Sequence, residues 1–358
     1  MRIALLGPSR NRVAEPFAGG QESYVATLST ALVRRGHHVT LYAAHGSDPT
    51  LADELVTYPQ LPQLSEVAAL DFQLPEPGFL RDQHAFLGAI DALITNRDSI
   101  DIVHNNSLHH LPLAASRAIG LPLVTTLHTP PFPWMELGVA LCDPRASFVA
   151  VSAALANQWT TLPQPADVIL NGVAISDFVA GPGGTDAVWA GRLVPEKGAD
   201  LAARTALRAG RNLRLIGPLS DQDWFESHLR PLLGRDVTYE GHLTQAEIAL
   251  AFGEAAVTLM TPRWEEPFGL VAVESALTGT PVLALDRGGL GEVVDQHIGL
   301  LVKPRHSDEE TVIALAGVLD DAAALPRPEV RARAIARFSM DRMVDDYEHL
   351  YHRAMLRW

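Results

Sequence analysis

Cysteine is almost absent from this sequence of 358 residues, which contains Cys142 alone. A single cysteine excludes a disulfide within the chain, and we expect a reducing compartment, the cytoplasm. Long apolar runs are absent too: no stretch of about 18 apolar residues is free of charge and proline, which excludes a transmembrane helix. The apolar run in MRIALLGPSRNR lacks a small-residue cleavage site and is typical of a first β-strand rather than a signal peptide.

Positive charge is scarce. The chain has 28 Lys and Arg residues against 42 Asp and Glu residues, which gives a formal net charge of -14. Nucleic-acid binding needs a basic face for the phosphates, so this balance argues against a nucleic-acid partner. Lysine is especially rare, since Lys197 and Lys303 are the only two. The bias is typical of an arginine-rich genome, but it makes the placement of Lys197 of interest.

Short apolar runs alternate with helical patterns from one end of the chain to the other. Apolar runs of this length separated by helices indicate parallel sheets covered on both faces. One open sheet of so many strands would be unusual, so we predict two sheets, each with its own core. The expected strands are 2–7, 39–43, 101–105, 122–128, 148–152 and 167–173, then 187–193, 212–218, 237–243, 256–262, 281–286 and 299–304.

These patterns predict an α/β protein with two Rossmann-like parallel-sheet domains. The glycine-rich segment 173–186 is the expected boundary, which places the domains at 1–175 and 176–339. The remaining residues, 340–358, carry apolar side chains at helical spacing and are expected to form a last helix. Segment 57–85 contains four prolines and is expected to be a long functional loop or a loosely helical insertion.

The segment EEPFGLVAVE, residues 265–274, follows an expected strand and is the most informative part of the sequence. Pro267 suits a helix start, and Gly269 lets the backbone approach a ligand. Backbone amides there would point outward at a helix amino end, which favours an anion. Glu266 and Glu274 could line one cleft and accept hydrogen bonds from vicinal hydroxyls. The alternative is a solvated acidic loop followed by a single helix carboxylate.

A second segment, GRLVPEKG (191–198), has the same strand–turn–helix pattern. Arg192 and Lys197 bracket the turn. Two cations in this position fit a diphosphate, with charge-assisted hydrogen bonds of roughly 1.5–3 kcal/mol each. The alternative is ordinary surface charge.

Two further glycine-rich segments follow expected strands, GGQE (19–22) and GGLGE (288–292). Gly19 and Gly20 precede the first helix and permit close approach to a phosphate or a sugar ring, although a plain flexible turn is an alternative. Neither segment is a GxGxxG, so a dinucleotide-binding fingerprint and an NAD oxidoreductase are disfavoured. The second segment could enclose a ligand from the opposite side.

No metal site is expected. Asp221 and Asp223 imitate a DxD metal motif, but they follow an expected strand and are better explained as helix caps. His104, His109 and His110 could bind a metal, but clusters of this kind more often line a cleft or a solvated face.

Taken together, the segments resemble the retaining glycosyltransferases of family 4, which have the GT-B fold. The resemblance covers nearly the whole chain in the family's order, and the pairing of GRLxxxKG with E-x7-E is its most specific part. It implies a central cleft between the two domains and a last helix that crosses back to the first. The matching segments are GGQE (19–22), TTLHTP with His128, VS (151–152), NGV (171–173), GRLVPEKG (191–198), a strand ending in Gly217-Pro218, YEGHL (239–243), EPFGLVAVE (266–274) and GGLGE (288–292).

The resemblance also implies a role for each matching residue. Arg192 and Lys197 would bind the diphosphate of a nucleotide-sugar donor. Glu266 would contact the sugar hydroxyls, Glu274 the ribose, and His128 the sugar near its 6-position. The implied catalytic residues are thus Glu266, His128, Arg192 and Lys197, and the implied donor-binding residues are Gly19, Gly20, Gly217, Phe268, Gly269, Leu270 and Glu274.

The family's reaction retains the anomeric configuration and needs no metal, so the implied cosubstrate is a nucleotide sugar, with UDP- or GDP-sugars favoured, and no further cofactor. Residues 1–172 contain nine Arg, no Lys and fifteen Asp or Glu, which does not favour contact with a membrane surface. We therefore expect a soluble metabolite or glycan as acceptor. A phosphorylase or disaccharide synthase on the same fold, and a nonenzymatic nucleotide-sugar binding protein, are the alternatives. Donor base, sugar, acceptor and oligomeric state stay open.

Overall fold

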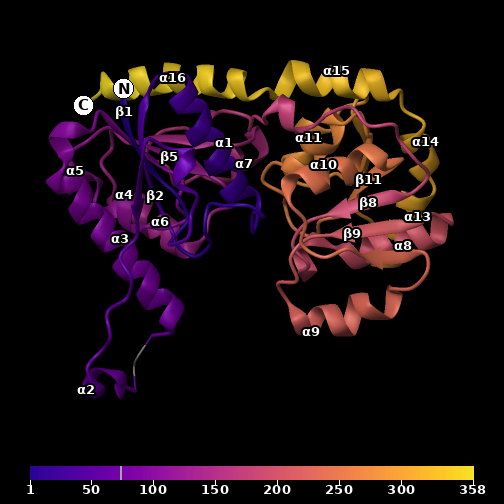
Figure 1. Cartoon of the computed structure of the whole chain (residues 1–358), viewed down its shortest axis with the longest axis horizontal. Coiled ribbons are helices and arrows are strands. Elements are labelled where there is room, and N and C mark those ends of the chain that lie inside the picture. Colours follow the sequence, from indigo (N-terminus) through magenta and orange to yellow (C-terminus); the bar gives the residue numbers. More distant parts are fainter. Residues whose placement is uncertain (73–74) are drawn as a thin grey trace.

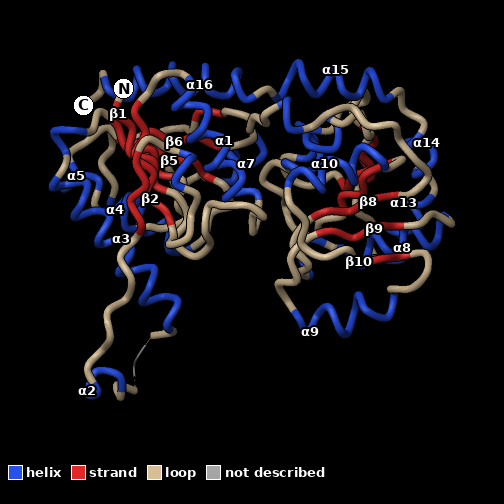
Figure 2. The backbone as a smooth tube through the Cα atoms, viewed as in Figure 1, coloured by secondary structure: helices blue, strands red, loops and turns tan. Residues whose placement is uncertain are grey.

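The computed structural model describes residues 1–72 and 75–358, and it contains two parallel β-sheets that lie side by side, each covered by helices (Figures 1 and 2). The predicted α/β class with two parallel-sheet domains is therefore confirmed. Within the described residues, no helix combines the length and the apolarity needed to span a membrane.

The first sheet has seven strands in the order β3-β2-β1-β4-β5-β6-β7, and all neighbours are parallel. Strands β4, β5 and β6 are buried at every position because helices cover both faces of the sheet. The strands are β1 (Arg2–Leu6), β2 (His38–Ala43), β3 (Glu54–Thr57), β4 (Ile102–Asn105), β5 (Leu123–Leu127), β6 (Ser147–Ala150) and β7 (Asp167–Val168).

The second sheet has six parallel strands in the order β10-β9-β8-β11-β12-β13. In both sheets the strand order reverses beside the first strand of the domain. Such a switch point is where open α/β sheets bind ligands. The strands are β8 (Ala187–Ala190), β9 (Leu213–Ile216), β10 (Val237–Tyr239), β11 (Val257–Met260), β12 (Val282–Leu285) and β13 (Gly299–Val302).

Helices connect the strands and cover the sheets. The longest in the first domain is α3, part of which projects with the short α2 away from the body (Figure 1). The helices are α1 (Gly20–Arg34), α2 (Glu66–Ala69), α3 (Pro77–Thr95), α4 (Leu111–Ala114), α5 (Ser116–Ile119), α6 (Pro133–Leu141), α7 (Ala153–Gln158), α8 (Ala199–Ala209), α9 (Gln222–Trp224), α10 (Gln245–Glu254), α11 (Leu270–Leu277), α12 (Leu290–Val293), α13 (Asp308–Ala316), α14 (Leu319–Ala323), α15 (Arg327–Phe338) and α16 (Met340–Met355).

Some elements differ from the sequence-based expectation. Strand β3 was not predicted, because it is a four-residue strand at the sheet edge with no strong apolar alternation. Several expected strands are shorter, such as the one that ends at Tyr239 rather than at residue 243. Segment 57–85 includes α2 and the start of α3, so the helical form of the predicted insertion is the one observed for its described residues.

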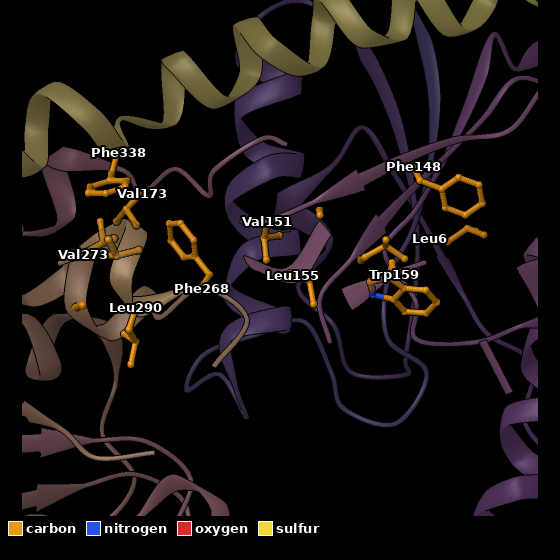
Figure 3. Close-up of a cluster of buried hydrophobic side chains, with 14 of the residues drawn as sticks. Leu6, Phe148, Val151, Leu155, Trp159, Val173, Phe268, Val273, Leu290 and Phe338 are labelled. Carbon is orange, nitrogen blue, oxygen red and sulfur yellow. The ribbon is translucent and has the colours of Figure 1, made fainter. Parts of the chain in front are cut away.

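The last helix, α16, lies along the first domain (Figure 1). Its Tyr347 hydroxyl accepts a 2.6 Å hydrogen bond from the Tyr24 hydroxyl of α1. The chain passes twice between the domains at one place, where Val173 forms a parallel bridge with Ser339. A buried apolar cluster that includes Phe148 of β6 and Phe268 of the second domain continues through this region (Figure 3). The two domains therefore share a packed apolar contact.

Candidate functional site

A cavity of about 430 Å³ lies between the domains, at the carboxyl ends of strands from both sheets. Its volume falls within the range of about 300–1,000 Å³ that is usual for small-ligand sites. Every residue that the sequence analysis placed in the site lines this cavity: Gly19, Gly20, His128, Arg192, Lys197, Gly217, Glu266, Phe268, Gly269, Leu270 and Glu274. The structure thus brings the set together from five separate segments, while the role of each residue stays a prediction.

The amino end of α11 faces the cavity. Gly269 precedes the helix with φ +97°, a conformation that L side chains rarely adopt, and a Cβ there would lie 2.5 Å from a methyl of Leu290. The Phe268 side chain is buried against the Phe338 ring, with centroids 5.9 Å apart. This packing anchors the loop that precedes α11. The first amides of α11 have no partner within the helix and can bind an anion or hydroxyl oxygens.

Lys197 and Glu266 form an ion pair inside the cavity. The Lys197 ammonium donates to Glu266 Oε2 at 2.7 Å, and the Trp264 indole N–H donates to the same oxygen at 2.9 Å. The ammonium also lies 4.9 Å from the centre of the Trp264 ring, within cation–π range. Glu266 itself is buried, with 9% of the residue exposed. Sequence reasoning placed both charges in the site but predicted neither their pairing nor Trp264.

The two loops that carry this pair are locked together. Gly198, next to Lys197, has φ +68°, and a Cβ there would lie 2.0 Å from the Thr261 carbonyl oxygen, so only glycine fits. Arg263 makes a bidentate pair with the buried Asp200, at 2.7 and 2.6 Å, and its backbone N–H donates to the Glu196 carbonyl at 2.8 Å. These contacts join the turn after β8, which carries Lys197, to the loop after the neighbouring strand β11, which carries Glu266.

The first domain contributes the opposite wall. Gly20 approaches the second domain so closely that a Cβ would lie 3.2 Å from a methyl of Leu270. Arg192, which lies in the second domain after β8, is exposed and has no ion-pair partner within the described part of the chain. Glu22 lines the cavity, is buried, and accepts a hydrogen bond from the Asn11 amide at 3.1 Å. Burial raises the pKa of Glu22. Its position in GGQE was a signal that the sequence analysis recorded without assigning the carboxylate a role.

Three polar residues of the first domain, His128, Thr129 and Asn171, line the cavity. His128 Nε2 lies 3.1 Å from Asn106 Oδ1, and its ring meets Tyr24 edge-on at 4.7 Å. Burial lowers the pKa of His128 to about 3, so the ring is neutral at physiological pH. Thr129 Oγ1 and Asn171 Oδ1, both from cavity-lining residues, are buried without a hydrogen-bond partner in the described structure. Such atoms favour a hydroxyl-bearing ligand. Asn171 belongs to NGV but was missed as a site residue.

Glu274 lies in the second turn of α11 and lines the cavity, with no hydrogen bond from the described residues. Burial raises its pKa to about 7. The folded protein therefore holds this proton more tightly than the unfolded chain does. The free energy of unfolding should therefore fall as the pH rises from the ordinary glutamate pKa of 4.5 to about 7, and level off above that.

We expect Glu274→Gln to stabilise the ligand-free protein by on the order of 2 kcal/mol near pH 8, because glutamine is neutral like the protonated acid. Near pH 4, where both folded and unfolded chains are largely protonated, the difference should be small. Thermal denaturation across this pH range measures the effect. Glu329→Gln, at an exposed position of α15, is the control. A gain that does not vary with pH would contradict the assignment.

Other sequence signals have structural explanations. Residues 288–292 do not line the cavity, so the idea that they enclose a ligand is not supported; instead the Gly289 N–H donates to the Glu266 carbonyl at 2.7 Å. Glu292 accepts hydrogen bonds from the first amides of α7, at 2.8 and 2.7 Å, and so joins the domains. Asp221 caps α9 through the Trp224 N–H, as expected.

Within the histidine cluster, His104 has a structural role. His104 is buried between the Tyr351 and Thr126 hydroxyls, at 2.6 and 2.8 Å. Across residues 1–72 and 75–358, no group of three or more His, Cys, Asp or Glu side chains is arranged to hold a metal ion.

Comparison with known proteins gives a consistent result. The family model for Glycosyltransferase Family 4 matches residues 18–177, and the model for Glycosyl transferases group 1 matches residues 181–337. A glycogen synthase of Mycobacterium tuberculosis is 29% identical over 92% of this chain and 88% of its own. An MMP α-(1→4)-mannosyltransferase of Mycolicibacterium hassiacum is 29% identical over 100% of this chain and 99% of its own.

Solved structures show the same architecture. A sucrose-phosphate synthase from Thermosynechococcus elongatus superposes with a TM-score of 0.77, at 20% identity, covering 100% of both chains. Anabaena HepE in complex with UDP and glucose superposes with a TM-score of 0.75, at 18% identity, covering 98% of this chain and 99% of its own. At these identities the likeness shows the fold, and it is the expected GT-B arrangement. The family models, the relatives and the fold agree, and the chain therefore belongs to glycosyltransferase family 4 and has the GT-B fold.

Proposed function

We propose that this enzyme transfers a sugar from a UDP- or GDP-sugar to a hydroxyl of a soluble carbohydrate or polyol in the cytoplasm, with retention of anomeric configuration and without a metal. The observation that carries the proposal is the charge arrangement of one cavity. Arg192, Lys197 and the amino end of α11 supply positive potential, and Glu266 and Glu274 supply hydrogen-bond acceptors beside it.

The leaving group is the first requirement of the reaction. Departure of a nucleoside diphosphate develops negative charge on its phosphate oxygens. Arg192 and Lys197 can stabilise that charge with charge-assisted hydrogen bonds, and the amides of α11 add the helix dipole. The amides of α11 lie in place before the donor arrives, whereas the Lys197 ammonium must leave Glu266 to reach the diphosphate. This supports a transfer in which protein cations, rather than a bound divalent metal ion, stabilise the charge of the leaving diphosphate.

The sugar is held on the other side of the leaving group. Glu266 can accept hydrogen bonds from its hydroxyls, and Glu274 can do the same for the ribose. Neutral His128, Thr129 and Asn171 provide hydrogen-bonding atoms on the first-domain wall. Because Glu266 is ion-paired and hydrogen-bonded, it is suited to orienting a substrate rather than to attacking it. That favours attack of the acceptor hydroxyl from the leaving-group face, with a phosphate oxygen taking the proton.

The relatives support the acceptor class. Their names describe a glycogen synthase, a mannosyltransferase forming α-(1→4) linkages and D-inositol 3-phosphate glycosyltransferases. In those names the stated products and acceptors are carbohydrates or polyols rather than lipids or proteins. The net negative charge of residues 1–172 also disfavours an anionic membrane surface as the acceptor side. Cys142 is buried and unpaired, which suits a reducing compartment.

The test is ligand binding in the presence of EDTA. Thermal shift and calorimetry are measured with UDP, GDP, ADP and TDP. A nucleotide at about 100 times its dissociation constant should stabilise the protein by roughly 2.7 kcal/mol. One clear binder without metal supports the donor site and names the base, and NMR of a transferred product then reports the anomeric configuration. Failure of all four to bind would overturn the proposed donor class.

A further inference from the structure

The carboxylate of Glu266 has two distinct oxygens. Oε2 accepts two hydrogen bonds, from Lys197 Nζ at 2.7 Å and from the Trp264 indole N–H at 2.9 Å. Oε1 accepts none from the described residues and is not among the buried unpartnered atoms, so it faces the cavity. One oxygen is therefore committed to the protein, and the other is available to a ligand.

Lys197 faces a conflict when a donor binds. Its ammonium is the partner of Glu266 in the ligand-free protein, and the proposed function assigns the same ammonium to the diphosphate. A diphosphate carries more charge than one carboxylate, so it draws the ammonium away from Oε2. Glu266 is buried, and a buried carboxylate that loses its partner pays a large desolvation penalty or turns away. Something else must hold the carboxylate in place at that moment.

We propose that Trp264 is the positioning residue that keeps Glu266 aimed at the donor sugar after Lys197 has turned to the diphosphate. The inference rests on the proposed function and deepens it. The indole N–H donates to Oε2 independently of Lys197, and it fixes the carboxylate plane so that Oε1 points at a sugar hydroxyl. The indole ring, 4.9 Å from the ammonium, also gives Lys197 a cation–π surface along which to move.

The indole is itself anchored on a rigid support. The neighbouring Arg263 donates to the Pro195 carbonyl at 3.1 Å, and its guanidinium binds Asp200 and Asp308. These contacts join the loop of Trp264 to the turn that carries Lys197. The indole N–H of Trp264 therefore keeps its position when Lys197 moves, as a positioning group must.

The test compares Trp264→Phe, which keeps an aromatic ring but removes the N–H, with the parent enzyme. Two quantities are measured: the dissociation constant of UDP or GDP, and the rate at which that nucleotide is released from UDP-glucose or GDP-mannose. We expect W264F to bind the nucleotide within about twofold of the parent, and to lose at least about tenfold in kcat, the scale of one hydrogen bond to a charged group. The matched control is Trp224→Phe, outside the cavity, which should leave both quantities unchanged.

A double-mutant cycle separates positioning from general damage. If Trp264 acts through Glu266, then W264F added to Glu266→Ala, which removes the acceptor of the indole N–H, should cost nothing further in kcat. A tenfold loss in both backgrounds, or a W264F enzyme as fast as the parent, overturns the inference. If W264F melts too low to assay, Trp264→His, which keeps a ring N–H, is compared with Trp264→Leu, and equal rates for the two also overturn it. A parent protein that binds neither UDP nor GDP overturns the proposed function and this inference together.

Discussion

Replacing Glu266 by glutamine is expected to lower the rate of sugar transfer by at least about 100-fold, the scale of one lost transition-state contact. The substitution keeps the shape of the side chain but removes its negative charge. That charge pairs with Lys197 and strengthens the hydrogen bonds that the carboxylate accepts from sugar hydroxyls. Because Lys197 is then free for the diphosphate, nucleotide affinity should stay the same or improve. Steady-state kinetics and calorimetry on the same preparation measure the two effects.

The control for this substitution is Glu196→Gln. Glu196 lies beside Lys197 in sequence, but it does not line the cavity. Both variants should melt close to the parent, since glutamine can still accept the Trp264 N–H at position 266. Near-normal turnover of E266Q would remove Glu266 from the reacting site, whatever the control shows.

Replacing Lys197 by methionine is expected to weaken UDP or GDP binding by about 10- to 100-fold, because one charge-assisted hydrogen bond to the diphosphate is lost. Methionine keeps most of the apolar stem against Trp264, so the change is mainly one of charge. Calorimetric titration at fixed ionic strength measures the affinity. The chain offers a natural control in Lys303, its only other lysine, which is exposed and outside the cavity.

The Lys197 substitution also leaves the buried Glu266 carboxylate without its cation. We therefore expect K197M to melt lower than the parent, while K197M/E266Q, which removes both charges, should recover much of that loss. The affinity measurement is made on both. Unchanged nucleotide affinity in the double variant would break the assignment of Lys197 to the diphosphate. Any weaker binding by K197M would then be due to its lower stability.

The positions of glycines and charges after the strands were readable from the sequence because the chemistry is local. GRLVPEKG and EPFGLVAVE each contain a turn glycine and charged side chains at a helix start, and in the structure Gly198 and Gly269 adopt the positive φ that such turns need. Periodicity likewise predicted two parallel sheets, since buried parallel strands read as short apolar runs. The short edge strand β3 was missed because an exposed edge leaves little apolar signal.

Other site features could not be predicted from local patterns. Trp264 gave no signal, because an aromatic residue in a loop is more often packing than ligand contact. Asn171 and Glu22 are polar residues whose role depends on what lies across the cleft, and their burial is visible only when both domains are placed. Conversely, residues 288–292 looked like a ligand loop but support the backbone of Glu266 instead.

By itself, the sequence determined the fold class, the family resemblance and the identity of the charged residues that meet in the cleft, because strand periodicity, turn glycines and helix-start chemistry act over a few neighbouring residues. Only the tertiary structure decided how those charges are partnered. The Lys197–Glu266 pair joins residues 69 positions apart, and the Glu292 contact joins the two domains. Such pairs form because folding brings distant charges into a site of low dielectric, where each needs a partner, and that need has no signature in the local sequence.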